Sequence, residues 1–116
     1  MDDRVLLTLT ILNERWDESW TVRRLAEEIG VHERYLRHLF FEETGTTIRE
    51  WLHRRRIKEA ATLLARTHLH VCDIGLRVGF KDASHFTRKF GSFFRVTPRE
   101  YRRRVKKGLF VIPRPD

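Results

Sequence analysis

The stretch from residue 47 to residue 66 constrains the fold more than any other part of the chain. It contains no Gly or Pro, and Thr47 and Glu50 form the Thr-x-x-Glu pattern typical of a helix start. At about 100° per residue, its apolar positions form two stripes on nearly opposite sides, whereas a helix packed on one core keeps a single stripe. The stripes are Ile48, Trp51 and Leu52, then Ile57, Ala60, Ala61 and Leu64. The sequence therefore predicts a helix about 28 Å long that is shared by two small cores.

The segments on either side of this helix carry the same pattern twice. Val22, Leu25, Ala26, Ile29, Gly30 and Val31 match Val71, Ile74, Gly75, Val78, Gly79 and Phe80 at an offset of 49. After one extra residue, Leu36 and Phe40 match Phe86 and Phe90 at an offset of 50. A short helix, a Gly-containing turn and a second helix form a helix-turn-helix. We predict an all-α fold of seven helices, with two helix-turn-helix subdomains joined by the long linker helix.

The same pattern divides the chain into parts. We expect an N-terminal subdomain at 1–46, the linker helix at 47–66, a C-terminal subdomain at 67–107 and an irregular tail at 108–116. The first helix is predicted over residues 3–16, and the helix over residues 32–44 is expected to turn Tyr35, Leu36, Leu39 and Phe40 inward. In the tail, Leu109, Phe110, Val111 and Ile112 either pack, bind a partner or stay exposed.

Charge is distributed unevenly along the chain. Residues 1–43 hold 6 basic and 10 acidic residues, whereas residues 44–116 hold 18 and 6, within a net charge of +8. A basic surface of this strength favours a polyanion, and nucleic acid is the usual one. The alternative interpretation is that the Arg runs at 54–56 and 102–104 are solvated helix faces.

Three other sequence features indicate where in the cell the protein is found. No apolar run approaches the ~20 residues of a membrane-spanning helix, and the N-terminus lacks the layout of a signal peptide. The single cysteine, Cys72, cannot form an internal disulfide, which agrees with a reducing compartment. We expect a cytoplasmic, nucleoid-associated protein.

The second helix of a helix-turn-helix enters the major groove of DNA, so we expect double-stranded DNA as the partner. The outward residues of the first such helix are His32, Glu33, Arg34, Arg37 and His38, and those of the second are Lys81, Asp82, Ala83, Ser84, His85, Thr87, Arg88 and Lys89. Arg37 has the reach to bind guanine O6 and N7, and Ala83 and Thr87 suit a thymine methyl. Phosphate contacts are expected from His32, Thr47, Arg49, Arg54, Lys81, Lys89 and Arg99.

The length of the linker helix bears on the DNA. Successive major-groove segments lie ~34 Å apart, which exceeds the ~28 Å helix. Bending the duplex toward the protein would meet that shortfall at a cost of ~1–6 kcal/mol. We predict a monomer on an asymmetric site with bent DNA.

A family resemblance rests on IGLRVGFKDASHFTRKF at residues 74–90, followed by VTPREYR at 96–102. From about residue 21 to residue 104 the chain resembles the DNA-binding domain of the AraC/XylS transcription regulators. The chain leaves no room for the effector-binding domain of most members, so it looks like the small stand-alone type, such as the multiple-antibiotic-resistance and superoxide-response activators. The resemblance implies a monomeric activator of transcription that contacts RNA polymerase and needs no cofactor.

The resemblance also implies site residues. The base-facing positions are Arg34, Arg37 and His38 in the first unit, and Ala83, Ser84, Thr87 and Arg88 in the second. Three residues depart from the family pattern. His32 replaces the usual Ser cap, which weakens the start of its helix; Gly75 stands where Ala is common; and Arg95 stands where many members have Gly.

The sequence gives less support to functions other than DNA-binding regulation. His68, His70 and Cys72, with His53 or His85, have metal-ligand chemistry, but their alternation is that of an extended linker and no metal site is expected. Ser84 and His85 point about 100° apart on a helix, so they do not form a catalytic pair, and no enzyme is expected. The remaining alternatives are a sequence-independent architectural DNA binder, a protein-interaction module, or a DNA-binding fragment of a larger effector-responsive regulator.

Overall fold

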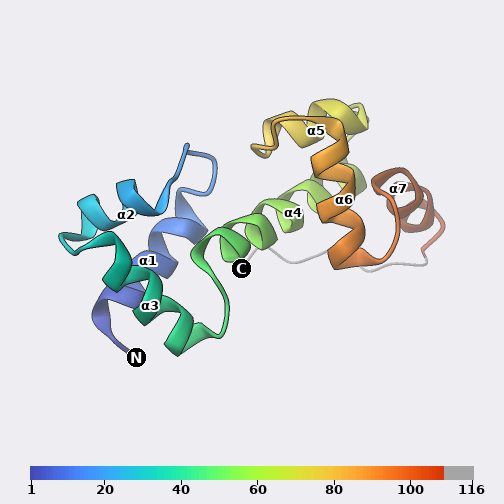
Figure 1. Ribbon diagram of the computed structural model, residues 1–116. Helices are drawn as coiled ribbons and strands as arrows, with labels where there is room; N and C mark the ends of the chain where they lie inside the picture. Colours follow the sequence, from blue (N-terminus) through green and yellow to red (C-terminus); the bar gives the residue numbers. More distant parts are fainter. Residues whose placement is uncertain (109–116) are drawn as a thin grey trace. The chain divides into compact units, whose positions relative to one another are not determined.

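Figure 1 shows the computed structural model, which describes residues 1–108 as seven α-helices without a β-strand. The helices are α1 (Asp3–Glu14), α2 (Val22–Ile29), α3 (Glu33–Thr44), α4 (Ile48–Arg66), α5 (Val71–Arg77), α6 (Ala83–Phe94) and α7 (Pro98–Lys106). The predicted all-α fold is therefore confirmed. The chain divides into two compact units between Arg55 and Arg56, inside α4.

The first unit has one core, formed by α1, α2, α3 and the first half of α4 (Figure 1). Its buried residues are Val5, Ile11, Leu12, Val22, Leu25, Ala26, Leu36, Phe40, Ile48 and Leu52. Together with the buried Thr8 of α1, they recur three and four positions apart along each helix, which places them on one side. α1 also buries Thr8, whose hydroxyl donates to the carbonyl of Arg4 at 2.8 Å. That polar group is therefore satisfied within its own helix.

Within this unit, α2 and α3 form the first helix-turn-helix. Thr21 Oγ1 accepts a hydrogen bond from the backbone N–H of Arg24 at 3.0 Å and so begins α2. Gly30 ends α2 at a φ of +84°, a left-handed conformation that a side chain would strain. Both residues act as the sequence predicts.

The second unit repeats this arrangement with α5 and α6, and α7 packs on α6 (Figure 1). The turn residue Gly79 has a φ of +102°. The guanidinium of Arg56 lies against Gly79, with Nη1 at 3.5 Å from its carbonyl oxygen. The core of this unit is rich in aromatic rings, whose neighbouring centroids lie 4.7–5.9 Å apart. These rings belong to Phe80, Phe86, Phe90, Phe94 and Tyr101.

The two helix-turn-helix units differ at one close contact. A methyl group on Gly75 would lie 2.8 Å from Cδ2 and 3.1 Å from Cβ of Phe86. The equivalent positions in the first unit hold Ala26 and Leu36, which are both buried. A smaller residue on the first helix thus accompanies a larger one on the second. This packing explains why Gly75 departs from the family pattern.

The linker helix α4 contributes to both cores. Ile48 and Leu52 are buried in the first core, whereas the apolar residues of the second half, Ile57, Ala60, Ala61 and Leu64, are buried in the second unit. Thr47 Oγ1 accepts from the backbone N–H of Glu50 at 3.1 Å, so the predicted start of the helix is confirmed.

An ion-pair network joins the end of α1 to α2. Glu18 accepts from Nε of Arg15 at 2.6 Å and from Nη2 of Arg24 at 2.7 Å. Both guanidinium groups also lie over the ring of Trp20, at 4.8 and 4.1 Å from its centroid. The hydrogen bond from Arg15, with that from Arg24, lowers the pKa of Glu18 to about 2.

Two expectations from the sequence are wrong in detail. α1 ends at Glu14 instead of Trp16, because the chain turns at Arg15, whose carbonyl accepts from the indole N–H of Trp20 at 2.7 Å. Tyr35 does not face inward. Its side chain is 43% exposed and lies under the guanidinium of Arg4, since Leu36 and Phe40 already fill the inward side of α3. The tail residues 109–112 lie outside the described residues.

Candidate nucleic-acid interface

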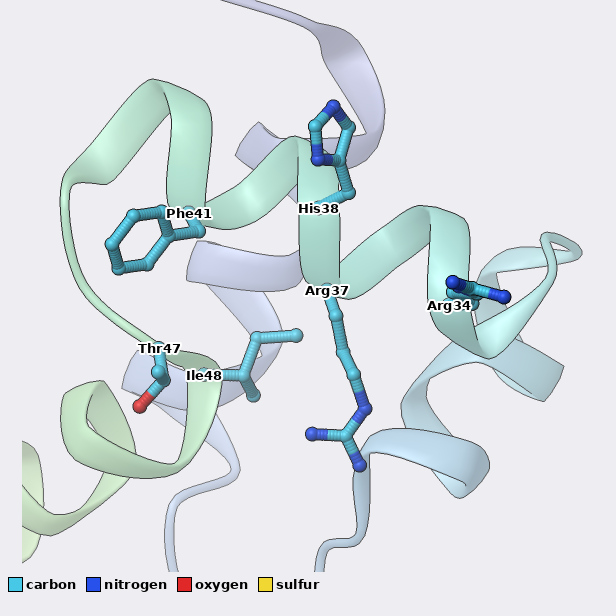
Figure 2. Close-up of a pocket in the computed structure, with 6 residues that line it drawn as sticks. All are labelled: Arg34, Arg37, His38, Phe41, Thr47 and Ile48. Atoms are coloured by element: carbon cyan, nitrogen blue, oxygen red, sulfur yellow. The ribbon is translucent and has the colours of Figure 1, made fainter.

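The outer face of α3 carries the first group of predicted base-contacting residues. Arg34, Arg37 and His38 are all exposed, and they line one hollow of about 330 Å³ together with Phe41, Thr47 and Ile48 (Figure 2). Arg34, Arg37 and His38 are three and four residues apart, which places them on one side of the helix. The structure therefore brings three predicted base-contacting residues together with Thr47, a predicted phosphate contact.

Acidic neighbours on α3 hold two of these side chains. Nη2 of Arg37 lies 3.0 Å from Oε1 of Glu33, one turn earlier. Nε2 of His38 lies 3.3 Å from Oε1 of Glu42, one turn later. The Arg37 side chain remains 58% exposed, so the ion pair orients it without burying it. Glu33, predicted to face outward, is half-buried and makes this contact with Arg37.

His32 caps α3 despite the expected weakness of that position. Its Nδ1 accepts a hydrogen bond from the backbone N–H of Arg34 at 3.2 Å. A neutral imidazole that accepts at Nδ1 carries its proton on Nε2. The second nitrogen can therefore donate outward, which suits the predicted phosphate contact. The cap was missed because histidine is not among the usual capping residues.

Phe41 is a residue of this face that the sequence analysis did not single out. Its side chain is 53% exposed, although the neighbouring Phe40 is completely buried. In Figure 2 the Phe41 ring extends from α3 toward the start of α4, where Thr47 and Ile48 lie. A signal was present, because Phe41 follows Arg37 by four residues and therefore shares its side of the helix.

The outer face of α6 carries the second group. Its four predicted base-contacting residues, Ala83, Ser84, Thr87 and Arg88, are all exposed. Asp82 begins the helix by accepting from the backbone N–H of His85 at 2.7 Å. The His85 ring meets Phe80 edge-on at 5.2 Å, so it is partly held against the core. α6 contains no acidic residue, whereas α3 contains three.

Six of the seven predicted phosphate contacts occupy exposed positions. Arg49, Arg54, Lys81 and Arg99 are exposed, as are His32 and Thr47, and Lys89 is half-buried. The guanidinium of Arg54 lies 5.6 Å from the ring centroid of Trp51, and aromatic stacking of this kind limits its orientations.

A second repeat, which the sequence analysis overlooked, links two of these positions. Thr47 and Arg49 at the start of α4 match Thr97 and Arg99 at the start of α7, at an offset of 50. Thr97 Oγ1 accepts from the backbone N–H of Glu100 at 3.1 Å, as Thr47 does from Glu50. Each unit therefore presents a capped helix N-terminus with an exposed Arg, a combination that attracts phosphate.

Charge at the start of α7 is partly neutralised within the helix. Glu100 is bound by Arg103 and by Nε of Arg104, the latter at 2.8 Å. These hydrogen bonds, first from Arg103 and then from Arg104, lower the pKa of Glu100 to about 2. Arg99 is the exposed cation of this turn.

Two further observations concern residues 1–108. No helix there combines the length and apolar character needed to cross a bilayer. Nor do three or more His, Cys, Asp or Glu side chains gather there as ligands of one metal ion.

The fold and the exposed faces of α3 and α6 define a protein of the double helix-turn-helix, DNA-binding class. Residues 25–104 match the family described as a helix-turn-helix domain. The transcriptional activator RhaR of Mannheimia succiniciproducens is 40% identical over 72 residues, which cover 62% of this chain and 26% of RhaR. The TetD protein of transposon Tn10 from Escherichia coli is 32% identical over 108 residues, which cover 88% of this chain and 78% of TetD.

Comparison with solved structures indicates the same class of protein. A transcriptional regulator of the AraC-type DNA-binding class from Chromobacterium violaceum superposes with a TM-score of 0.82 at 27% identity, covering 89% of this chain and 92% of that one. The chain belongs to the AraC/XylS family of helix-turn-helix DNA-binding transcription regulators. It spans about a quarter of the length of RhaR and most of the length of TetD.

Proposed function

We propose that this chain activates transcription by binding a specific double-stranded DNA site in a promoter. In this proposal α3 and α6 each enter a major-groove segment, and the two segments form one asymmetric site. A single chain supplies both helices, so the protein binds as a monomer, and it bends the duplex. The bound protein then contacts RNA polymerase, in the bacterial cytoplasm and associated with the nucleoid.

One observation carries this proposal. In each unit, the second helix of a helix-turn-helix buries one side in its own core and exposes polar or basic residues on the other. On α3 the buried side holds Leu36 and Phe40, and the exposed side holds Arg34 and Arg37. An exposed second helix with this division is the element that reads base edges in such proteins.

The proposed roles follow from chemistry and position. Arg37 binds guanine O6 and N7 with its two-pronged guanidinium, and Arg88 has the same capacity on α6. Arg34, His38 and Ser84 contact neighbouring base edges, and Ala83 and Thr87 contact thymine methyl groups. The residues that contact phosphate are those predicted from the sequence. They position the protein on the duplex without reading its base sequence. Residues 47–66 serve as the linker between subdomains at 1–46 and 67–107.

Selection of bound oligonucleotides from a random pool tests the proposal directly. We expect a single asymmetric motif with two conserved segments. The Arg37→Ala variant should then lose ~1–3 kcal/mol of binding free energy on that motif and tolerate more bases at one position. Arg54→Ala is the matched control, because it also removes an exposed Arg but should weaken specific and random DNA alike.

The rival function is sequence-independent binding by an architectural protein. It predicts that selection returns no motif and that random competitor DNA displaces the probe as well as the selected site does, at every salt concentration. Equal losses on specific and random DNA for Arg37→Ala would remove that residue from the base contacts. A duplex that stays straight in a phased-bend gel assay would refute the bending.

A further inference from the structure

Phe41 is a large apolar side chain exposed within a polar, cationic surface. It follows Arg34 by seven residues, Arg37 by four and His38 by three, so all four lie on one side of α3. They line the same hollow, which Thr47 and the buried Ile48 also line (Figure 2). The residues that line this hollow therefore include two guanidinium groups and one aromatic ring.

The core of the first unit does not account for this ring. Phe40 supplies the aromatic group of that core, where its ring meets Trp51 edge-on at 6.1 Å. Phe41 lies about 100° further around the helix and is 53% exposed. Other exposed apolar side chains of the unit, such as Leu6 and Leu7 on α1, do not line the hollow. The apolar surface of Phe41 therefore belongs to the binding face.

The chemistry of the groove restricts what the ring can meet. The two Arg side chains select a polyanion, and the major-groove edges of the bases present donors, acceptors and a single apolar group, the C5 methyl of thymine. Burial of that methyl against an aromatic ring removes apolar surface of both groups from water. Thymine is the only base whose major-groove edge offers a methyl group for this contact.

We infer that Phe41 is a specificity-determining residue that selects thymine, by contact of its ring with the C5 methyl group, beside the base that Arg37 reads. This inference rests on the proposed function, because it requires α3 to lie in the major groove. It adds an apolar discriminator to a face whose other base contacts are hydrogen bonds. The first unit should therefore prefer a site in which a thymine adjoins the guanine bound by Arg37.

Deoxyuridine scanning tests the inference, because deoxyuridine differs from thymidine only by the missing methyl. Each thymine of the selected site is replaced singly, and Kd is measured for the complete chain and for Phe41→Ala. At one thymine in the segment read by α3, we expect the original protein to lose about fourfold in affinity, the effect of one buried methyl-sized group. Phe41→Ala should lose affinity for the thymine site and respond at that position by less than about 1.5-fold.

Two controls separate this contact from a structural effect. Leu7→Ala removes a similarly exposed apolar side chain outside the hollow and should leave the deoxyuridine response unchanged. Phe41→Leu keeps an apolar side chain and should retain part of the response. Because Phe41 is exposed, both Phe41 variants should unfold at the same urea concentration as the original protein.

The outcomes distinguish the inference from the proposed function. If the original protein and Phe41→Ala respond equally to every deoxyuridine, Phe41 does not read a methyl group and the inference is overturned. If selection returns no motif at all, the proposed function fails and the inference fails with it. A deoxyuridine response confined to the segment read by α6, where Ala83 and Thr87 lie, also overturns the inference while leaving the proposed function intact.

Discussion

Replacement of Gly75 by alanine tests how closely α5 and α6 must approach. The new methyl group would lie 2.8 Å from Cδ2 and 2.9 Å from Cγ of Phe86, where carbon atoms normally keep about 3.5–4.0 Å. It would also lie 3.1 Å from Cβ of Phe86, an atom at the root of the side chain. Ring rotation cannot move that atom, so α6 itself must shift away from α5.

Two opposing terms set the magnitude of this effect. Overpacking a core of this kind costs ~1–3 kcal/mol, whereas replacing Gly by Ala inside a helix stabilises it by ~1 kcal/mol. We expect Gly75→Ala to lower the free energy of unfolding by about 1 kcal/mol, because the clash reaches the root of Phe86. A stability equal to or higher than that of the original protein would refute this account of the contact.

The double variant Gly75→Ala/Phe86→Leu provides the sharper comparison. It installs the pair that the first unit uses at the equivalent positions, Ala26 and Leu36. The leucine vacates the space that the methyl group needs, so the double variant should be more stable than the sum of the two single effects predicts, by ~0.5–3 kcal/mol. Strict additivity would show that Gly75 and Phe86 do not constrain each other.

Urea unfolding followed by far-UV circular dichroism measures these differences. Tryptophan fluorescence supplies a second probe, because all three Trp residues lie in the first unit. If the two units unfold together, both probes shift equally in Gly75→Ala; if they unfold separately, only the circular dichroism transition shifts. Either result reports how strongly α4 couples the units.

Three other predictions concern charges and one strained residue. Glu33→Gln should release Arg37 from its 3.0 Å ion pair and raise the affinity for all DNA, because it removes a negative charge. Selection and competition assays should show a wider choice of bases at the position that Arg37 reads. An unchanged choice of bases would show that Glu33 does not position Arg37. Arg95 has a φ of +64°, so Arg95→Gly should raise the free energy of unfolding by about 0.5–1 kcal/mol; an unchanged or lower value in urea would contradict this. The folded-state pKa values of Glu18 and Glu100, about 2, lie below their ordinary value of 4.5, so their stabilisation is present above pH 4.5 and is lost as pH falls toward 2. Acid titration followed by circular dichroism should show this loss, and Glu18→Gln or Glu100→Gln should reduce it.

The fold was predictable where local chemistry decides the backbone. Gly30 and Gly79 mark two left-handed turns, and the repeat around them required two similar units. The two stripes of the linker helix likewise required two cores, because each apolar side must be buried. The conformation of Arg95 was harder to predict, since it occupies a left-handed position that most residues avoid.

Details of the candidate interface were less accessible because they depend on side-chain orientation. The cap provided by His32 follows from the direction of its ring, which composition does not reveal. Phe41 adjoins Phe40, and a pair of neighbouring aromatic residues leaves open which of them faces the core. The sequence predicts an inward Tyr35, although Leu36 and Phe40 fill that side. For Tyr35 and Phe41, competition between neighbouring residues for the inward side of α3 decided the outcome.

The change of buried side within α4, between Leu52 and Ile57, has a consequence for sequence variation. Adding one residue there would turn the second stripe by about 100° relative to the first, and the second unit, which buries that stripe, would turn with it. Adding seven residues would turn it by only about 20° and lengthen the helix by about 10 Å. Relatives that bind one DNA site through both units should therefore differ in this segment by substitutions and keep its residue count.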